Sequence, residues 1–332
     1  MVTIKDIARA AGVTHSTVSR ALNNEAGVSE KMRQKIADIA RQMNYVPNVA
    51  AKRLIRKKTN YIGLIWPRME GLFFYNLSLA LHKEGKKRGY DVIMTMADPV
   101  EALRSFNQLM VDYVVYWTGF IDWVPSFDFI KEAERFDGKM ILLGGGKMEG
   151  AHSIEINRRG GIYEAVRYLA ELGHRSIGFV GYPSLDKFNG YMQGITEFGL
   201  NYRPDFVVNS TESSKEQAFE AFIDKSDRPS ALVVDCQGTL VWLNRLLKRH
   251  RLHIPDDMSL IVYDDVPEME MFDIPPTTVG PSIDRLVDRS LELLLPGAVT
   301  ERADGDEDGA WTHETMEPTL TVRQSTREIH NG

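Results

Sequence analysis

The sequence predicts an α/β protein: a three-helix head at the N-terminus, followed by a larger body of parallel sheets covered by helices. Three observations lead to this prediction. Apolar residues recur at helical spacing through residues 3–43. Beyond residue 60, short apolar runs alternate with amphipathic segments, which is typical of strand–helix units. The chain of 332 residues is 43% hydrophobic, so it can bury more than one small core.

The first two predicted helices form a helix-turn-helix unit. An apolar stripe opens the chain, Gly12 breaks the first helix, and Thr14 caps the second. The two stripes consist of Ile4, Ile7, Ala8 and Ala11, and of Val18, Ala21 and Leu22. Two short helices joined by a tight glycine turn are the helix-turn-helix arrangement. The second helix then presents His15, Ser16, Ser19 and Arg20 on the face that the core does not use.

A third helix completes the head. Ser29 caps it, Ile36 and Ile39 lie in its apolar stripe, and Asn44 ends it. A domain of about 60 residues buries little apolar surface, so we expect part of the head to become ordered on DNA.

Charge separates the head from the body. Residues 1–60 carry 12 Lys or Arg and 4 Asp or Glu, a net charge of +8, whereas the whole chain is −6 and the remainder is −14. A basic end suits the phosphate backbone of nucleic acid, and an acidic body is repelled by it. A charge run alone is typical of a solvated helix face, but its coincidence with the helix-turn-helix pattern favours DNA binding.

Several absences narrow the class of protein. Cys236 is the single cysteine, which leaves no disulfide framework and suits a reducing compartment. The N-terminus has no apolar signal segment, and no run of 18 apolar residues is present. We therefore expect a cytoplasmic, nucleoid-associated protein with no membrane partner.

Neither a metal nor a cofactor is predicted. Residues 304–309 open like a calcium loop, but Thr315 stands where the closing Glu is needed, so we expect an acidic exposed hairpin loop. Glycines 144–146 lack the remaining residues of a phosphate loop and are expected to form a turn. The histidines show no metal-binding spacing, and Cys236 is expected to be structural. No acid, base and nucleophile come together, so an enzyme is not predicted.

Strands and helices alternate through the body. Strands are predicted over 62–66, 91–96, 113–117, 140–143, 176–180, 231–234 and 259–263. Helices are predicted over 77–88, 102–110, 162–172, 215–224, 240–250 and 284–295. Two parallel sheets with a ligand cleft at the strand ends between them are the simplest arrangement of these elements.

Five motifs in residues 3–65 are long and specific: residues 4–8 (IKDIA), 12–14 (GVT), 17–23 (TVSRALN), 45–48 (YVPN) and 62–65 (IGLI). Looser motifs follow at 172–181, 254–265, 276–279 and 322–326. Together they resemble the LacI/GalR family of transcriptional regulators. The resemblance implies a dimeric regulator that binds a double-stranded DNA operator and a small-molecule effector, a sugar or sugar derivative among the candidates.

The resemblance also implies how the chain is divided. It places the DNA-binding domain at 1–47, a hinge helix and linker at 48–60, and a periplasmic-binding-protein-like body at 61–332. The body would consist of subdomain N (61–159 and 287–317) and subdomain C (160–286 and 318–332), with three crossovers between them. The family's C-terminal tetramerising heptad is absent, which favours a homodimer.

The resemblance implies that the helix beginning after Thr14 enters the major groove of DNA. His15 and Ser16 would meet base edges beside Ser19, and Arg20 suits the O6/N7 pair of guanine. Phosphate contacts would come from Thr3, Asn23 and Tyr45. An exposed salt bridge is the alternative role for Arg20.

In relatives, the hinge helices of two protomers lie together in the minor groove. Asn48 can cap this helix, Ala51 matches a small residue that permits close approach, and Leu54 matches a leucine that wedges into the central base step. Lys52 replaces the usual arginine, which keeps the charge but loses bidentate contact. Packing against the body is the alternative role for Leu54.

The cleft departs from the family. Relatives that bind sugars commonly have an Asp before Asn157, an Arg at 187 and an Asn-Asp pair at 236–237, where this chain has Ile156, Lys187 and Cys236-Gln237. Clamping of adjacent sugar hydroxyls is weakened, so either the effector differs from a simple polyol or none is used. The predicted effector-binding set is Asn157, Lys187, Gln237 and Asp264 with the aromatic residues Phe74, Trp117 and Tyr182. Ordinary packing or surface exposure is the alternative for each.

Three classes of function are consistent with the sequence. A transcriptional regulator, expected to repress carbohydrate-related genes, accounts for both the head and the body. A solute-binding protein without DNA activity would not need the basic head, and an enzyme lacks a catalytic constellation. Within the first class, control by a protein co-effector is the alternative to control by a small molecule.

We predict that Leu54→Ala weakens binding to a specific operator far more than binding to unrelated DNA, because only the specific complex is kinked. Fluorescence anisotropy with both duplexes measures the two affinities. Equal losses on both duplexes would rule out the wedge role.

Overall fold

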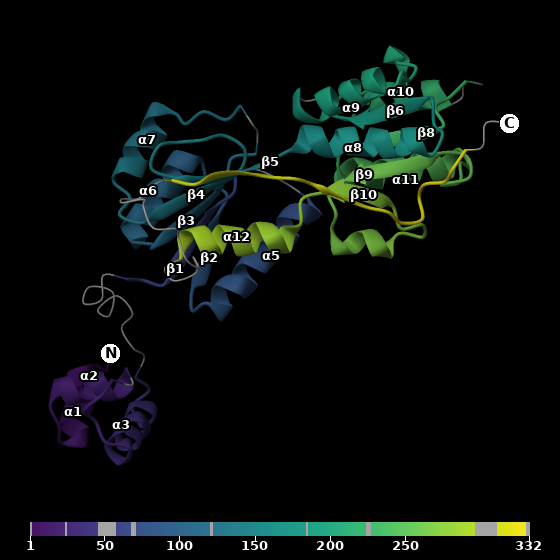
Figure 1. Ribbon diagram of the computed structural model, residues 1–332. Coiled ribbons are helices and arrows are strands. Elements are labelled where there is room, and N and C mark those ends of the chain that lie inside the picture. Colours follow the sequence, from purple (N-terminus) through teal and green to yellow (C-terminus); the bar gives the residue numbers. More distant parts are fainter. Residues whose placement is uncertain are drawn as a thin grey trace, which may run out of the picture. The chain divides into compact units, whose positions relative to one another are not determined.

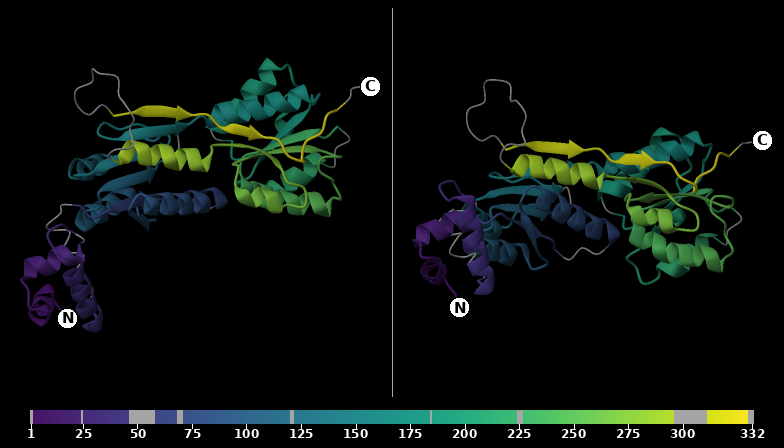
Figure 2. Two further views of the ribbon diagram at one scale, coloured as in Figure 1. Left: turned by 60° about the horizontal axis from the view of Figure 1, so that its bottom comes forward. Right: turned by 90° about the horizontal axis from the view of Figure 1, so that it is seen from below.

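The computed structural model describes residues 2–23, 25–45, 58–67, 71–119, 122–183, 185–223, 227–295 and 311–329. The chain divides into two compact units, Met1–Thr59 and Asn60–Gly332, which we call the head and the body. The head is helical, and the body has two sheets flanked by helices (Figures 1 and 2). None of the helices in the described ranges combines the length and apolarity that crossing a bilayer requires.

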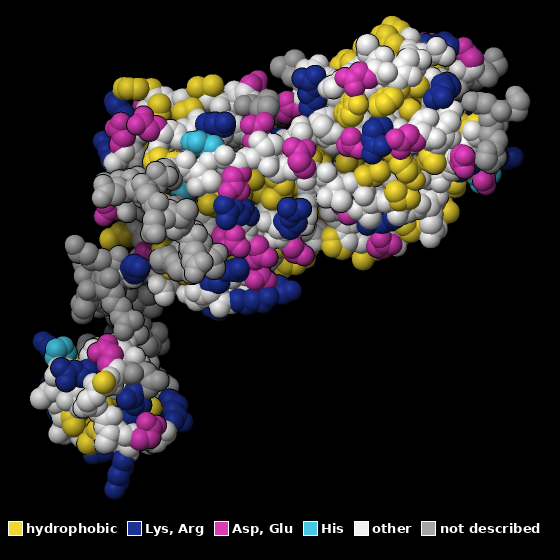
Figure 3. All heavy atoms as spheres, in the orientation of Figure 1, with side chains coloured by type: hydrophobic (Ala, Val, Ile, Leu, Met, Phe, Trp, Pro, Cys, Tyr) yellow, Lys and Arg dark blue, Asp and Glu magenta, His cyan; other side chains and the backbone are white. Residues whose placement is uncertain are grey.

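The head consists of three helices, as the apolar spacing predicted: α1 (Ile4–Ala11), α2 (His15–Leu22) and α3 (Glu30–Gln42). The Thr3 N–H donates to Asp6 Oδ2 (2.9 Å) at the start of α1, and Gly12 ends this helix with a φ of 71°. One small core joins the helices, and Ile7, Val18 and Ile36 are fully buried in it. Lys and Arg side chains lie over the surface (Figure 3).

Subdomain N is built on a six-stranded, fully parallel sheet in the order β11-β5-β4-β3-β1-β2. Its strands are β1 (Tyr61–Ile65), β2 (Asp91–Thr95), β3 (Tyr113–Trp117), β4 (Lys139–Gly144), β5 (His152–Ile156) and β11 (His313–Met316). Its helices are α5 (Leu72–Lys87), α6 (Pro99–Leu109), α7 (Phe127–Glu134) and α12 (Ile283–Leu294). Alternate residues of β3 serve different cores: Val115 and Trp117 pack with α5 and α12, and Val114 and Tyr116 pack with α6 and α7.

Subdomain C contains the second sheet, in the order β12-β10-β9-β8-β6-β7. Its strands are β6 (Ile177–Gly181), β7 (Val207–Asn209), β8 (Ala231–Val234), β9 (Ser259–Tyr263), β10 (Thr277–Gly280) and β12 (Thr319–Thr321). Its helices are α8 (Arg158–Glu171), α9 (Leu185–Glu197), α10 (Lys215–Ile223) and α11 (Gln237–Arg249), with 3-10 turns η1 (Pro204–Phe206) and η2 (Pro267–Met271). β12 runs antiparallel to β10, so this sheet is not wholly parallel as the alternating pattern suggested.

The backbone passes between the two sheets three times, from β5 to α8, from β10 to α12 and from β11 to β12. The third passage is the pair of yellow strands in Figure 2. The second passage ends before Ile283, so the subdomain limit that we placed between 286 and 287 falls inside α12. This helix stays whole because Leu286, Val287 and Leu291 are buried together against the first sheet.

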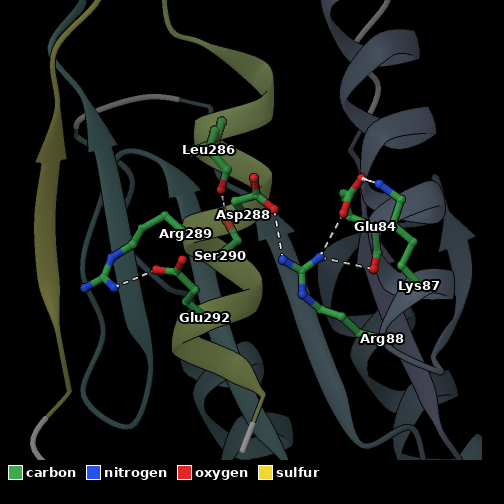
Figure 4. Close-up of polar contacts among 8 residues, drawn as sticks. All are labelled: Glu84, Lys87, Arg88, Leu286, Asp288, Arg289, Ser290 and Glu292. Atoms are coloured by element: carbon green, nitrogen blue, oxygen red, sulfur yellow. Dashed lines mark hydrogen bonds and ion pairs between the residues drawn. The ribbon is translucent and has the colours of Figure 1, made fainter. Parts of the chain in front are cut away.

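The helices α5 and α12 lie side by side on the first sheet (Figure 4). Arg88 Nη2 donates to Asp288 Oδ1 across the two helices at 2.9 Å, and Arg88 Nη1 also contacts Glu84. Within α12, the Ser290 hydroxyl donates to the Leu286 carbonyl at 2.5 Å. Buried apolar side chains with a polar outer edge thus fix this helix pair within subdomain N.

Several elements differ from the predicted ones. The helix expected at 77–88 begins at Leu72, because the aromatic run at its start also packs into the core. α7, α9, β5, β7, β10, β11 and β12 were not predicted. The acidic hairpin loop expected at 304–309 lies outside the described residues.

His174 is buried in subdomain C and contacts three separate segments of the chain, at Ser230, Ser259 and Arg327. Its Nδ1 lies 2.9 Å from Ser230 Oγ, and its Nε2 lies 3.0 Å from Ser259 Oγ and 3.2 Å from the Arg327 carbonyl. The carbonyl can only accept, so Nε2 carries the proton. Burial lowers the pKa of His174 to about 4, against a smaller raising effect of the Arg327 hydrogen bond.

We predict an acid-sensitive contribution of His174 to stability. Between pH 6.5 and 4 the His174 imidazole is protonated in the unfolded chain but not in the folded chain. The free energy of unfolding therefore decreases as the pH is lowered, by roughly 3 kcal/mol at pH 4. Denaturant titrations of the wild type and His174→Gln from pH 7 to 4.5 measure the difference. His174→Gln should be less stable than the wild type at pH 7, and its free energy of unfolding should depend less steeply on pH. Identical pH dependence in the two proteins would show that His174 is not the titrating group.

Candidate functional site

The exposed face of α2 carries the residues predicted to read bases. His15, Ser16 and Arg20 are exposed, and Ser19 is half-buried. Thr14 caps the helix by accepting from the Thr17 N–H (3.2 Å), and its hydroxyl lies 2.8 Å from Ser16 Oγ. The cap therefore fixes the N-terminal turn, where a recognition helix meets base edges.

Arg20 is the strongest candidate for a base contact. Within residues 2–23 and 25–45, no acidic side chain forms an ion pair with it, whereas Arg9, Arg33 and Arg41 do pair with neighbouring acids. The salt-bridge alternative for Arg20 thus has no support in the described part of the head.

The three predicted phosphate contacts have structural contacts of their own. The Thr3 hydroxyl donates to Asp6 Oδ2 (2.7 Å), Asn23 lies at the C-terminal end of α2, and Tyr45 packs half-buried against the head core. Their phosphate contacts remain predictions. The four hinge residues Asn48, Ala51, Lys52 and Leu54 lie outside the described residues.

The body contains a cavity of about 410 Å³ at the carboxyl ends of the strands. Subdomain N contributes Phe73 and Phe74 from α5 and Trp117 from the end of β3. Subdomain C contributes residues that directly follow its strands, among them Tyr182, Asp235 and Asp264. Parallel strands place such residues at one edge of each sheet, so the two edges together form the cavity.

Six of the seven predicted effector-binding residues line this cavity: Phe74, Trp117, Tyr182, Lys187, Gln237 and Asp264. Asn157 does not. Its Oδ1 accepts from the Gly160 N–H (2.9 Å) as the cap of α8, and its Nδ2 donates to Glu317 (2.7 Å). Asn157 directly precedes α8, and an asparagine at that position commonly caps a helix; this was the sequence signal for its structural role.

Four charged or polar lining residues were missed by sequence reasoning: Arg158, Asp186, Asp235 and Tyr263. All four stand next to a predicted residue or at the end of a predicted strand. The signal was the strand end itself, since polar residues directly after parallel strands point to a ligand site.

Arg158 connects the two sides of the cavity. Its Nη1 donates to the Gly144 carbonyl of subdomain N at 2.6 Å and lies 3.8 Å from Asp186 Oδ2. Its guanidinium lies 5.8 Å from the centre of the Trp117 ring. Burial raises the pKa of Asp186, and the Arg158 charge opposes this shift.

Lys187 contacts two residues of subdomain C. Its Nζ donates to the Asp235 carbonyl (2.5 Å) and lies 3.9 Å above the Tyr263 ring, a cation–π distance. Asp235 accepts the Tyr182 N–H at Oδ2 (2.7 Å). Lys187 is thus already in contact with the protein.

Gln237 bridges the cleft. In the amide orientation that its neighbours satisfy, Nε2 donates to Asp264 Oδ2 (2.8 Å), and the side-chain oxygen accepts from the N–H groups of Leu72 (2.9 Å) and Phe73 (3.1 Å). Those N–H groups open α5 in the other subdomain and have no partner within their own helix. Burial raises the pKa of Asp264, which has a φ of 79°.

Cys236 also lines the cavity, but burial raises the pKa of its thiol. A neutral thiol is a weak nucleophile, and within the described ranges no base contacts Cys236 to activate it. Among the described residues, no three His, Cys, Asp or Glu side chains lie close enough to hold a metal ion.

A helix-turn-helix head followed by a two-sheet body with a lined cleft defines a two-domain DNA-binding regulator. The family model described as bacterial regulatory proteins, lacI family, matches residues 3–48, and a periplasmic binding protein-like domain matches residues 166–326. The HTH-type transcriptional regulator DegA of Bacillus subtilis (strain 168) is 30% identical over 85% of this chain and 87% of its own length. The chain belongs to the LacI family.

Two further similarities agree with this membership. The HTH-type transcriptional repressor PurR of Vibrio cholerae is 27% identical over 89% of this chain and 91% of its own length. The lac repressor dimer bound to operator and the anti-inducer ONPF matches with a TM-score of 0.77 at 21% identity, covering 98% of this chain and 99% of that chain. The protein is a DNA-binding transcriptional regulator with an effector-binding domain, and it is not an enzyme.

We predict that Gln237→Ala lowers the free energy of unfolding of the body by about 1–3 kcal/mol, because it leaves the α5 N–H groups and Asp264 without this buried partner. Denaturant titration followed by tryptophan fluorescence measures the change. Val241→Ala, exposed on the same helix α11, is the matched control and should change stability by less than about 0.5 kcal/mol. A Gln237→Ala protein as stable as this control would contradict the bridging role.

Proposed function

We propose that the protein represses carbohydrate-related genes by binding a pseudopalindromic operator as a homodimer, and that a small molecule in the cleft modulates its affinity for DNA. One observation carries the DNA-binding part: the basic head presents exposed His15, Ser16 and Arg20 on a capped α2. In the proposed complex α2 lies in the major groove, with Arg20 on a guanine.

Exposed apolar side chains support the proposed homodimer. Tyr75 and Leu79 on α5 are 59% and 50% exposed, and Met94 and Met96 on and beside the edge strand β2 are 49% and 62% exposed. Neighbouring apolar side chains and an unpaired strand edge favour association with another chain. Pairing of two identical faces about a two-fold axis would match the symmetry of a pseudopalindromic site.

The cavity supports a small effector over a protein co-effector. The departures at 156, 187 and 236–237 suggested a weakened site, but Arg158, Asp186 and Asp235 supply charged groups to the same cavity. Solved relatives of similar fold are described with cellobiose or with ribose bound. We extend this class of ligand to the present chain only as part of the proposal.

The test of the DNA-binding part is selection from a pool of duplexes with a randomised centre, using the full-length chain at low and at near-physiological salt. The expected outcome is enrichment of sites with two inverted half-sites. Failure to enrich any site, with cell metabolites added as well, would overturn the proposed function.

We predict that Arg20→Ala weakens binding to the selected duplex by about 1–3 kcal/mol per half-site and relaxes the preference at one base pair, because a bidentate guanine contact is lost. Competition anisotropy against single-base variants of the duplex measures both effects. Arg41→Ala, which removes an exposed arginine paired with Asp38, is the control and should leave base preference unchanged. Unaltered preference in Arg20→Ala would show that Arg20 reads no base.

A further inference from the structure

Three residues that line the cavity each have a buried polar atom without a hydrogen-bond partner among the described residues: Trp117 Nε1, Asp235 Oδ1 and Tyr263 OH. Their side chains are 3%, 7% and 2% exposed. Buried polar groups are normally paired, and a buried carboxylate oxygen in particular requires a donor. Together they define what a ligand has to offer: an acceptor for the indole N–H and a donor for Asp235.

The charges around the cavity do not cancel. Two cations, Arg158 and Lys187, stand among three carboxylates, Asp186, Asp235 and Asp264. Each cation is already engaged, Arg158 by the Gly144 carbonyl and Asp186, and Lys187 by the Asp235 carbonyl and the Tyr263 ring. Among the described residues, neither Asp235 nor Asp264 has a cation within ion-pair distance. Gln237 donates to Asp264 Oδ2, whereas Asp235 Oδ1 has no partner, so Asp235 offers the carboxylate oxygen left for the ligand.

The remaining lining is aromatic. Phe73, Phe74 and Trp117 form one cluster with ring centres 5.5 Å apart, and Tyr182 lines the opposite subdomain. Aromatic faces attract cations as well as apolar surface. An anionic ligand would instead meet surplus carboxylates, two of which already have raised pKa values because of burial.

We propose that the effector is a hydroxylated amine, such as an amino sugar, whose ammonium group binds Asp235 Oδ1. Its hydroxyl oxygens accept from Trp117 Nε1, and Tyr263 OH completes the polar contacts. The ammonium neutralises the surplus carboxylate, so neutral sugars bind more weakly and phosphorylated sugars are rejected. This inference rests on the small-molecule part of the proposed function and names the ligand class of that site.

The test is calorimetric titration of the full-length protein with matched probes: glucosamine, galactosamine and mannosamine against glucose, galactose and mannose, the N-acetylated amines, and glucose 6-phosphate. At least one free amine should bind about 10- to 100-fold more tightly than its neutral counterparts, the range of a charge-assisted hydrogen bond. A neutral or phosphorylated sugar that binds more tightly than every amine would overturn the proposal, and so would silence across the panel.

Variants locate the contact. Asp235→Asn keeps an acceptor for the Tyr182 N–H but removes the charge, and it should abolish the preference for the amine over the neutral sugar. Asp256→Asn makes the same change of charge at an exposed position outside the cavity and should keep the preference. Trp117→Phe keeps the ring without the N–H and should weaken amine and neutral sugar equally. If Asp235→Asn still preferred the amine over the neutral sugar as strongly as the wild type, Asp235 would not be the group that binds the ammonium.

Each variant is also titrated with the selected duplex. A failure confined to ligand binding refutes the ligand class while DNA binding persists, whereas a wild-type chain without specific DNA binding refutes the proposed function instead.

Discussion

The three passages of the backbone between the two sheets constrain the rest of the body. Each sheet packs against its own helices, and one buried apolar cluster contains residues of both subdomains, among them Phe73 and Val266. The polypeptide joins them only at residue 157, at 281–282 and at 317–318. Away from these points, contacts such as Gln237 with α5, Arg158 with Gly144 and Asn76 with Glu268 hold the cleft. Opening the cleft therefore breaks these polar contacts and also separates apolar side chains of the cluster that the two subdomains share.

Because both subdomains line the cavity, a ligand bound there can favour one arrangement of the two subdomains over another. Its walls come from both subdomains, and its polar groups are the ends of strands that the sheets hold in place. A ligand that contacts both walls stabilises one arrangement over another by the difference in its binding free energies. The head has a net positive charge and attracts DNA phosphates, whereas the body has a net negative charge and does not.

Much of this was predictable from the sequence. The head followed from apolar spacing, Gly12 and the cap at Thr14, which are local signals. The long central strands were visible as apolar runs, but short edge strands such as β7 and β12 are stabilised by their neighbours in the sheet and have little pattern of their own. Asn157 does not line the cavity and caps α8 instead, a role that the sequence before this helix allowed but that we did not assign to it. Asp235 directly follows the predicted strand 231–234 and could have been included on that ground, whereas its unpaired Oδ1 is visible only in the three-dimensional structure.

The most direct test of the account asks whether cleft geometry alone sets the affinity for DNA. Cysteines at Asn76 and Glu268, in a Cys236→Ser background, allow a short bismaleimide to fasten the two subdomains where these side chains meet at 2.9 Å. Cysteines at Arg88 and Asp288, which meet at 2.9 Å within subdomain N, serve as the control. We expect cross-linking of the first pair to change affinity for the selected duplex by about 5- to 150-fold, and cross-linking of the control pair to leave it unchanged. Equal affinity before and after cross-linking the first pair would contradict the account.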